Sequence, residues 1–109
     1  MIVKVEKESL REKVVIRAYS TSKKFLLNGE KVDFNVDKFC YHICDMTARW
    51  PEKLVNEDIV DGLRYSIVIK HVDCKEHYTF VNKFPEDIQR LSSLIREVEE
   101  YARKQELSK

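Results

Sequence analysis

Alternating apolar and polar residues near the start of the chain predict two β-strands, at residues 2–7 and 13–19. The second of them, KVVIRAY, is rich in β-branched side chains, which fit a pleated surface. A competing pattern overlaps it, because Ser9 and Glu12 have the spacing of a helix capping box. The segment 8–19 is therefore compatible with either a strand or a short helix.

Two later segments predict β-hairpins. In KKFLLNGEKVDF the dipeptide Asn28-Gly29 suits the positive φ angles of a type I′ turn, so Phe25 is expected to face Val32. Farther on, LRYSIVIKHV and HYTFVN flank the four-residue loop DCKE. One face of this second hairpin should carry Tyr65, Ile67, Ile69, His71, Tyr78 and Phe80. The opposite face, which is half apolar, should carry Ser66, Val68, Lys70, Val72, His77, Thr79 and Val81.

The apolar period changes from two to 3.6 in two segments, which predicts helices over residues 36–50 and 85–106. Asn35 is the expected N-cap of the first helix, and Pro51 is expected to end it. Strands joined by tight turns, with one helix between them and one after them, indicate an α+β fold. We expect a single domain over residues 1–109, built as an antiparallel sheet of about four to six strands with both helices on one face.

The stretch FCYHICD places two cysteines around a histidine, which would suit a metal site if the segment were a strand. On a helix, about 100° per residue separates His42 from Cys40 by about 160°, so the two side chains cannot share a metal ion. The helix reading instead predicts a core stripe formed by Val36, Phe39, Cys40, Ile43, Met46, Thr47 and Trp50. We favour the helix and the core stripe.

The apolar arc of this helix continues past Cys40 to Cys44, Ala48 and Tyr41, so that it spans roughly 220°. One sheet face cannot bury so wide an arc. Either the second helix and the segment PEKLV cover its flank, or Tyr41, Cys44 and Ala48 are exposed and form a contact with another chain.

A second group of possible metal ligands is His71, Cys74 and His77, at the tip of the second hairpin. Structural zinc takes four ligands, and an even loop length would send the two histidines to opposite faces of the sheet, so we predict no metal site. The chain has only two glycines, which excludes a glycine-rich nucleotide-binding loop, and no cofactor is expected.

Charge and composition limit the partners and the cellular location that we expect for the protein. Lys and Arg number 20 against 19 Asp and Glu, a net charge of +1 that makes nucleic acid an unlikely default partner. Charged residues interrupt the start of the chain, and no segment is apolar over the length of a membrane span, so we expect a cytoplasmic protein with free thiols.

The leading hypothesis is a small non-catalytic protein-protein interaction module, with weak homodimerisation as one form of it. The alternative is a nucleic-acid-binding module that uses basic residues around the sheet. Its candidate residues are Lys23, Lys24, Arg64, Lys70, Lys75 and Lys83, beside Tyr65, Tyr78 and Phe80. Metal binding through His71, Cys74 and His77 is the third hypothesis.

Overall fold

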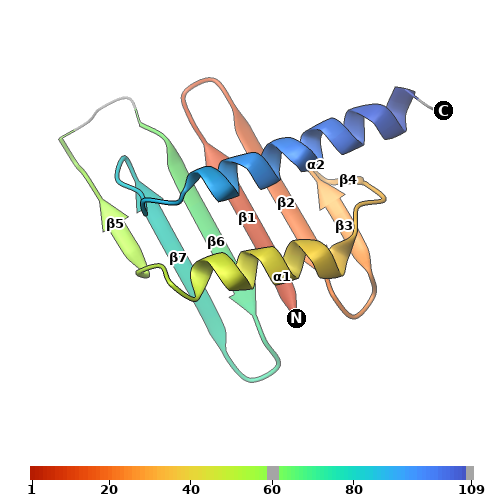
Figure 1. The fold of residues 1–109 in the computed structure, drawn as a ribbon, viewed down its shortest axis with the longest axis horizontal. Helices are drawn as coiled ribbons and strands as arrows, with labels where there is room; N and C mark the ends of the chain where they lie inside the picture. The colour runs from red at the N-terminus through yellow and green to blue at the C-terminus, as the bar shows by residue number, and fades with distance from the viewer. Residues whose placement is uncertain (59–61, 108–109) are drawn as a thin grey trace.

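The computed structural model describes residues 1–58 and 62–107, which form one β-sheet with two helices on one of its faces (Figure 1). In chain order the elements are β1 (Ile2–Glu8), β2 (Lys13–Tyr19), β3 (Lys24–Leu27), β4 (Glu30–Lys31), α1 (Val36–Thr47), β5 (Lys53–Val55), β6 (Arg64–Lys70), β7 (Lys75–Val81) and α2 (Gln89–Leu107).

The sheet has seven strands in the order β4-β3-β2-β1-β6-β7-β5. The predicted α+β fold is confirmed, but the expected four to six strands are too few. β4 has two residues and β5 has three, which is too short to produce a readable alternation. β5 also differs in direction, because it pairs parallel to β7 whereas every other described pair is antiparallel.

The ambiguous segment at residues 8–19 is a hairpin, not a helix. β1 pairs with β2 along its whole length, from Ile2 opposite Tyr19 to Glu8 opposite Lys13. Ser9 and Glu12 close the turn between them, since the Ser9 amide donates to the Glu12 carbonyl at 2.8 Å. Pairing with β1 on one side and β3 on the other outweighs the local capping signal.

The Asn28-Gly29 turn has the predicted form. Both residues have positive φ, 51° and 85°, and Leu27 lies directly opposite Glu30. The amide of Val32 donates to the carbonyl of Phe25 at 3.0 Å, so the predicted register is confirmed.

The second hairpin turns two residues earlier than predicted. Lys70 lies opposite Lys75, so the loop is residues 71–74 and not 73–76. A shift of two residues leaves every side chain on its predicted face, because the side-chain period of a strand is two. His71 and Val72 both move from the strand to the loop. His71 stays on the helix side, where it contacts Glu76, whereas Val72 is fully exposed.

Both helices are shorter than predicted at the end next to a proline. α1 begins after Asn35, whose side chain accepts a hydrogen bond from the Lys38 amide, and it ends at Thr47. The next three residues form a tighter turn, in which Trp50 donates to Thr47 before Pro51. At α2, residues 85–88 likewise form a turn ahead of the helix.

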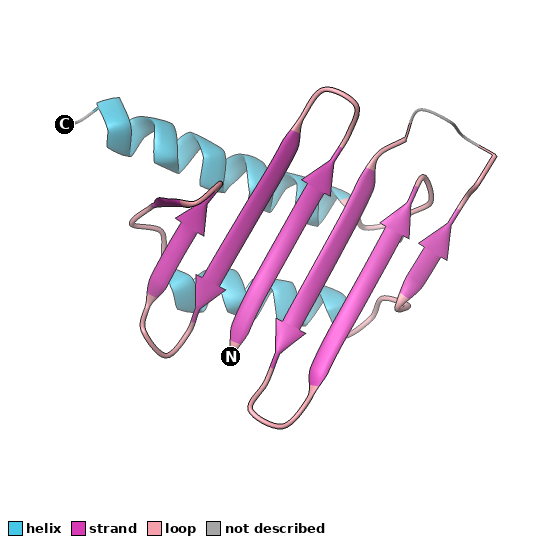
Figure 2. Ribbon diagram, turned by 180° about the vertical axis from the view of Figure 1, so that it is seen from behind, coloured by secondary structure: helices cyan, strands magenta, loops and turns pink. Residues whose placement is uncertain are grey.

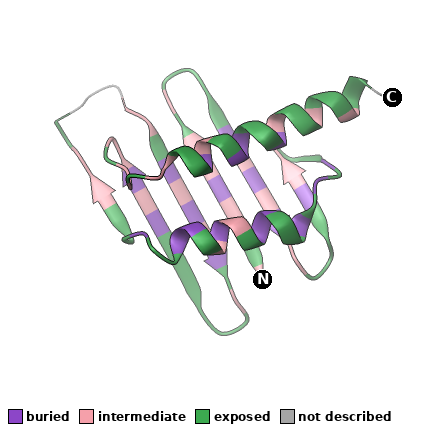
Figure 3. Ribbon diagram, in the orientation of Figure 1, coloured by how far each residue is buried: buried purple, intermediate pink, exposed green. Residues whose placement is uncertain are grey.

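The core lies between the helices and the sheet (Figure 3). The predicted stripe on α1 is buried at every position, which confirms that FCYHICD is helical. Aromatic rings of Phe25, Phe34 and Phe39 pack together at one end, and Trp50 packs against Phe80 at the other. The short dimension of the molecule, 21 Å, accommodates one helical layer on one sheet.

Seen from behind, the sheet lies in front of both helices, and neither of them crosses its other face (Figure 2). We call this other side the open face. None of the described helices is long and apolar enough to cross a lipid bilayer.

Candidate functional site

Side chains on the open face follow from strand alternation and register. Val3, Val5 and Ile16 are buried under the helices, so their neighbours in β1 and β2 point the other way. The hydrogen-bonded register then arranges the open-face residues in rows that cross the strands.

Two adjacent rows contain basic and apolar residues and no carboxylate. The first row is Lys24, Tyr19, Ile2, Lys70 and Lys75. The second row is Lys31, Leu26, Arg17, Lys4, Val68 and His77. We call these two rows the basic half-face. The other two rows are mixed in charge and contain Glu6 and Glu8.

Most of the positive charge on the basic half-face is not neutralised by neighbouring carboxylates. Lys4 forms an ion pair with Glu6, at 2.8 Å between Nζ and Oε1. Among the described residues, Arg17, Lys24, Lys31, Lys70 and Lys75 form no ion pair with an acidic side chain. The surface therefore has unpaired cations although the net charge of the chain is only +1.

Like charges stand directly opposite each other at two places on this surface. Lys4 pairs with Arg17 across β1 and β2, and Lys70 pairs with Lys75 across β6 and β7. Like charges directly opposite each other destabilise a sheet, whereas opposite charges at the same positions stabilise it by roughly 0.2 to 1 kcal/mol. Glu6 offsets part of the repulsion between Lys4 and Arg17, whereas no acidic side chain of the described residues pairs with Lys70 or Lys75. A bound anion would relieve both pairs.

The pKa of Glu6 reports the positive potential. The hydrogen bond from Lys4 lowers this pKa most, and the charges of Lys4, Lys13 and Arg17 lower it further, against the opposing effect of burial. Cations on two neighbouring strands therefore stabilise an anion at the edge of the basic half-face.

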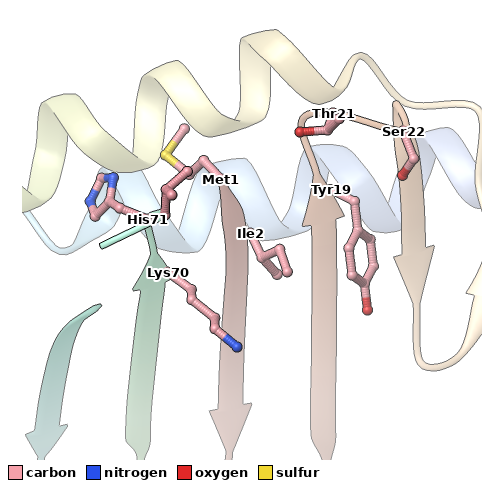
Figure 4. Close-up of a pocket in the computed structure, with 8 residues that line it drawn as sticks. Met1, Ile2, Tyr19, Thr21, Ser22, Lys70 and His71 are labelled. Carbon is pink, nitrogen blue, oxygen red and sulfur yellow. The ribbon is translucent and has the colours of Figure 1, made fainter. Parts of the chain in front are cut away.

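A pocket of about 410 Å³ lies where the basic half-face meets the end of the sheet. Tyr19, Ile2 and Lys70 lie side by side on three neighbouring strands, while Met1 and His71 lie nearer to α1 (Figure 4). Thr21, Ser22 and Val72 complete the lining. The pocket thus combines an aromatic ring, aliphatic groups, hydroxyls and a lysine.

The tip of the second hairpin forms a hydrogen-bonded network. His71 Nε2 lies 2.7 Å from Glu76 Oε2, and the hydroxyl of Tyr78 donates to Glu76 Oε1 at 2.8 Å. The bond to His71, followed by that to Tyr78, lowers the pKa of Glu76, while burial and Glu76 raise the pKa of Tyr78. These contacts stabilise the end of the hairpin on the side that faces the helices, because Glu76 shares a face with the buried Tyr78.

The residues of the metal hypothesis do not converge. His71 contacts Glu76 on the helix side, whereas the ring of His77 lies against Ser66 and Thr79 on the open face. Cys74 is exposed in the loop between them. Within residues 1–58 and 62–107, no three His, Cys, Asp or Glu side chains gather where they could hold a metal ion.

The cysteines that flank His42 are poorly suited to thiolate chemistry. Burial, followed by the neighbouring Cys44, raises the pKa of Cys40 to about 11. Burial and the charge of Glu76 also raise the pKa of Cys44, whose sulfur lies 3.9 Å from that of Met1. Both thiols are therefore protonated near neutral pH.

The flank of α1 that was predicted as a partner contact is partly exposed. Tyr41 is 67% exposed and Ala48 is exposed, whereas Cys44 packs against the core. α2 does not cover this flank, since the ion pairs between the helices, Arg90 with Asp45 and Lys38 with Glu97, lie on another side of α1.

The residues of the nucleic-acid hypothesis divide between the two faces. Lys24, Arg64, Lys70 and Lys75 are on the open face. The aromatic residues Tyr65, Tyr78 and Phe80 are buried under the helices and cannot stack on a base. Lys23 forms an ion pair with Asp37 of α1, and Lys83 is exposed in a loop.

Sequence reasoning missed the centre of the basic half-face. Tyr19, Arg17, Lys4, Ile2 and Leu26 were not identified as surface residues of a site. The alternation of residues in MIVKVEK and KVVIRAY does indicate that these side chains share one face of their strands. The missing information was that β1 lies in the middle of the sheet, between β2 and β6.

Comparison with known proteins adds no relative: no protein-family model matches the chain, and neither a curated protein nor a solved structure is significantly similar to it.

Proposed function

We propose that this protein is a small non-catalytic interaction module that binds an anionic macromolecule across its basic half-face. One observation carries the proposal: opposed like charges, Lys4 with Arg17 and Lys70 with Lys75, stand on a sheet face that neither helix covers. Isolated like-charge pairs cost stability, so their presence together favours a role in binding.

The apolar residues of the basic half-face support an extended contact. Tyr19, Leu26 and Val68 are partly exposed between the basic side chains. A mixture of aliphatic, aromatic and basic groups on a flat surface is suited to binding a large partner, since charge directs the encounter and apolar burial adds affinity.

Charge-matched variants on a heparin column test the proposal. Lys70→Glu and Arg96→Glu change the net charge equally, but Lys70 is on the open face and Arg96 is an exposed residue of α2. We expect Lys70→Glu to elute at clearly lower salt than the wild type, and Arg96→Glu to elute close to it. Equal elution of the two variants would mean that net charge alone governs retention, and the proposal would be wrong.

Self-association is a second candidate, favoured by the exposure of Tyr41. Two copies cannot readily join through their basic half-faces, because like charges would meet. On the flank of α1 formed by Tyr41, Cys44 and Ala48, the nearby Asp37 is neutralised by its ion pair with Lys23, so this flank is the better surface for a weak homodimer.

A further inference from the structure

We infer that the anionic partner is a single-stranded nucleic acid, bound across the strands with phosphates on the basic side chains and bases on the apolar ones. The inference rests on the proposed function and specifies its partner. It is carried by the order in which charged and apolar groups follow one another on the basic half-face.

The basic side chains form three pairs that follow one another across the sheet, shifting between the two rows of the basic half-face. Lys31 and Lys24 lie on β4 and β3, Arg17 and Lys4 on β2 and β1, and Lys70 and Lys75 on β6 and β7. Neighbouring strands are about 4.8 Å apart, so the centres of successive pairs are about 10 Å apart. A single strand of a few nucleotides is long enough to contact all three pairs in turn.

Within each row, apolar side chains interrupt the series of basic ones. In the first row, Tyr19 and Ile2 lie between Lys24 and Lys70. In the second row, Leu26 lies between Lys31 and Arg17, and Val68 follows Lys4. Cations therefore alternate with flat or aliphatic surface, as phosphates alternate with bases along a nucleic acid. Aromatic stacking of a base contributes about 1 to 3 kcal/mol and tolerates any sequence.

The pocket beside Tyr19 provides space for a base. Its volume of about 410 Å³ lies within the range of small-ligand sites, and it is lined by the ring of Tyr19, the side chain of Ile2 and the lysine at position 70 (Figure 4). A base in contact with Tyr19 would place its phosphate within reach of Lys24 or Lys70, the neighbours of Tyr19 and Ile2 in the same row.

The shape of the surface favours a single strand over a duplex. The major groove admits an α-helix or a two-stranded ribbon, whereas the basic half-face belongs to a sheet of seven strands. Unpaired bases can instead lie flat on such a sheet. An acidic protein could also bind the cations, but it would leave the alternation with apolar groups around Tyr19 unexplained.

Fluorescence anisotropy with a labelled oligodeoxythymidine about 12 nucleotides long tests the inference, with polyglutamate as a second ligand. We expect the oligonucleotide to bind, with affinity falling steeply between about 50 and 200 mM salt. Arg17→Glu should weaken binding about tenfold or more, and Tyr19→Leu about tenfold, while Arg96→Glu should stay near the wild type. Arg17→Glu also turns a like-charge pair into an opposite-charge pair, so its melting temperature should not fall.

The outcomes separate this inference from the proposed function. Binding of polyglutamate but not of the oligonucleotide, lost in Arg17→Glu, would identify an acidic protein as the partner; the inference would be wrong and the proposed function would stand. Oligonucleotide binding that all three variants weaken equally would overturn the inference, because the contact would lie elsewhere. Failure to bind either ligand would overturn both.

Discussion

At the scale of single residues, the three thiols differ in access and in pKa. Cys74 is exposed in the loop after β6, Cys44 is partly buried, and Cys40 is 3% exposed with a pKa raised to about 11. A buried thiol reacts only when the structure opens around it. We expect a disulfide reagent to modify Cys74 first, Cys44 second and Cys40 last.

Mass spectrometry of peptides from the labelled wild-type protein would measure the three rates. Denatured protein supplies the control, since the three rates should then become similar. Equal rates for Cys40 and Cys44 in the folded protein, both slowed by zinc, would contradict the helical arrangement of FCYHICD.

Glu76 should make the free energy of unfolding depend on pH in the acid range. Its pKa is lowered in the folded state, chiefly by His71 and then by Tyr78, so its contribution is present above the unfolded value near 4.5 and is lost as pH falls through the folded value. The side chain is 45% exposed, so we expect an effect below about 1 kcal/mol.

Urea unfolding between about pH 6 and pH 3, followed by Trp50 fluorescence, would measure the contribution of Glu76. Glu76→Gln should lose less stability over this range than the wild type does. Glu12→Gln, at an exposed turn position, serves as the control and should follow the wild type. The same pH dependence in Glu76→Gln and the wild type would show that the network makes no contribution.

At the scale of elements, the turn between β3 and β4 depends on one glycine. Gly29 has φ of 85°, and a Cβ there would meet no atom within 4 Å, so the cost of Gly29→Ala is that of the backbone alone. We expect a loss of about 1 to 2 kcal/mol in the free energy of unfolding. Thr21→Ala, in the turn before β3, is the control and should change little; an unaffected Gly29→Ala would contradict a type I′ turn.

The exposed flank of α1 predicts weak self-association. Light scattering over micromolar to millimolar protein should show a rising mass for the wild type and none for Tyr41→Glu, whose melting temperature should be unchanged because Tyr41 is 67% exposed. A wild type that stays monomeric would remove the reason for the contact. Unfolding of Tyr41→Glu would mean that Tyr41 is needed by the core.

At the scale of the whole molecule, the fold should not need metal. A chain of 109 residues can bury an adequate core without a structural ion, and the core between helices and sheet is continuous. Protein treated with EDTA should keep its far-UV circular dichroism and melting temperature. Stoichiometric zinc together with a large fall in melting temperature on its removal would show instead that the fold needs zinc. His71, Cys74 and His77 would then be the first ligands to test.

The sequence predicted those features that arise from neighbouring residues. Asn28-Gly29 specified both a turn type and a register, and Asn35 marked the start of α1, because each acts through its own backbone. The loop of the second hairpin was placed wrongly, since HVDC and DCKE leave the same side chains on the same face and alternation cannot distinguish them. β5 was missed because its pairing comes from β7, far away in sequence.

The basic half-face could be predicted only in part for a related reason. Lys24, Lys70 and Lys75 were recognised as basic residues around a sheet. These lysines form one surface with Lys4 and Arg17 because of the strand order, which comes from packing between distant segments. Composition concealed it as well, because acidic residues elsewhere bring the net charge to +1.

The central position of β1 also has a consequence for synthesis on the ribosome. Residues 1–47 include β1 to β4 and α1, but one edge of β1 has no partner until β6 is made. At about 5 to 20 residues per second, translation from residue 47 to residue 70 takes about one to five seconds. During this interval the nascent chain presents an open edge, at which unrelated strands could add. Lys4 and Glu6, which alternate with Val3 and Val5 along that edge, are the kind of charged residues that discourage such pairing.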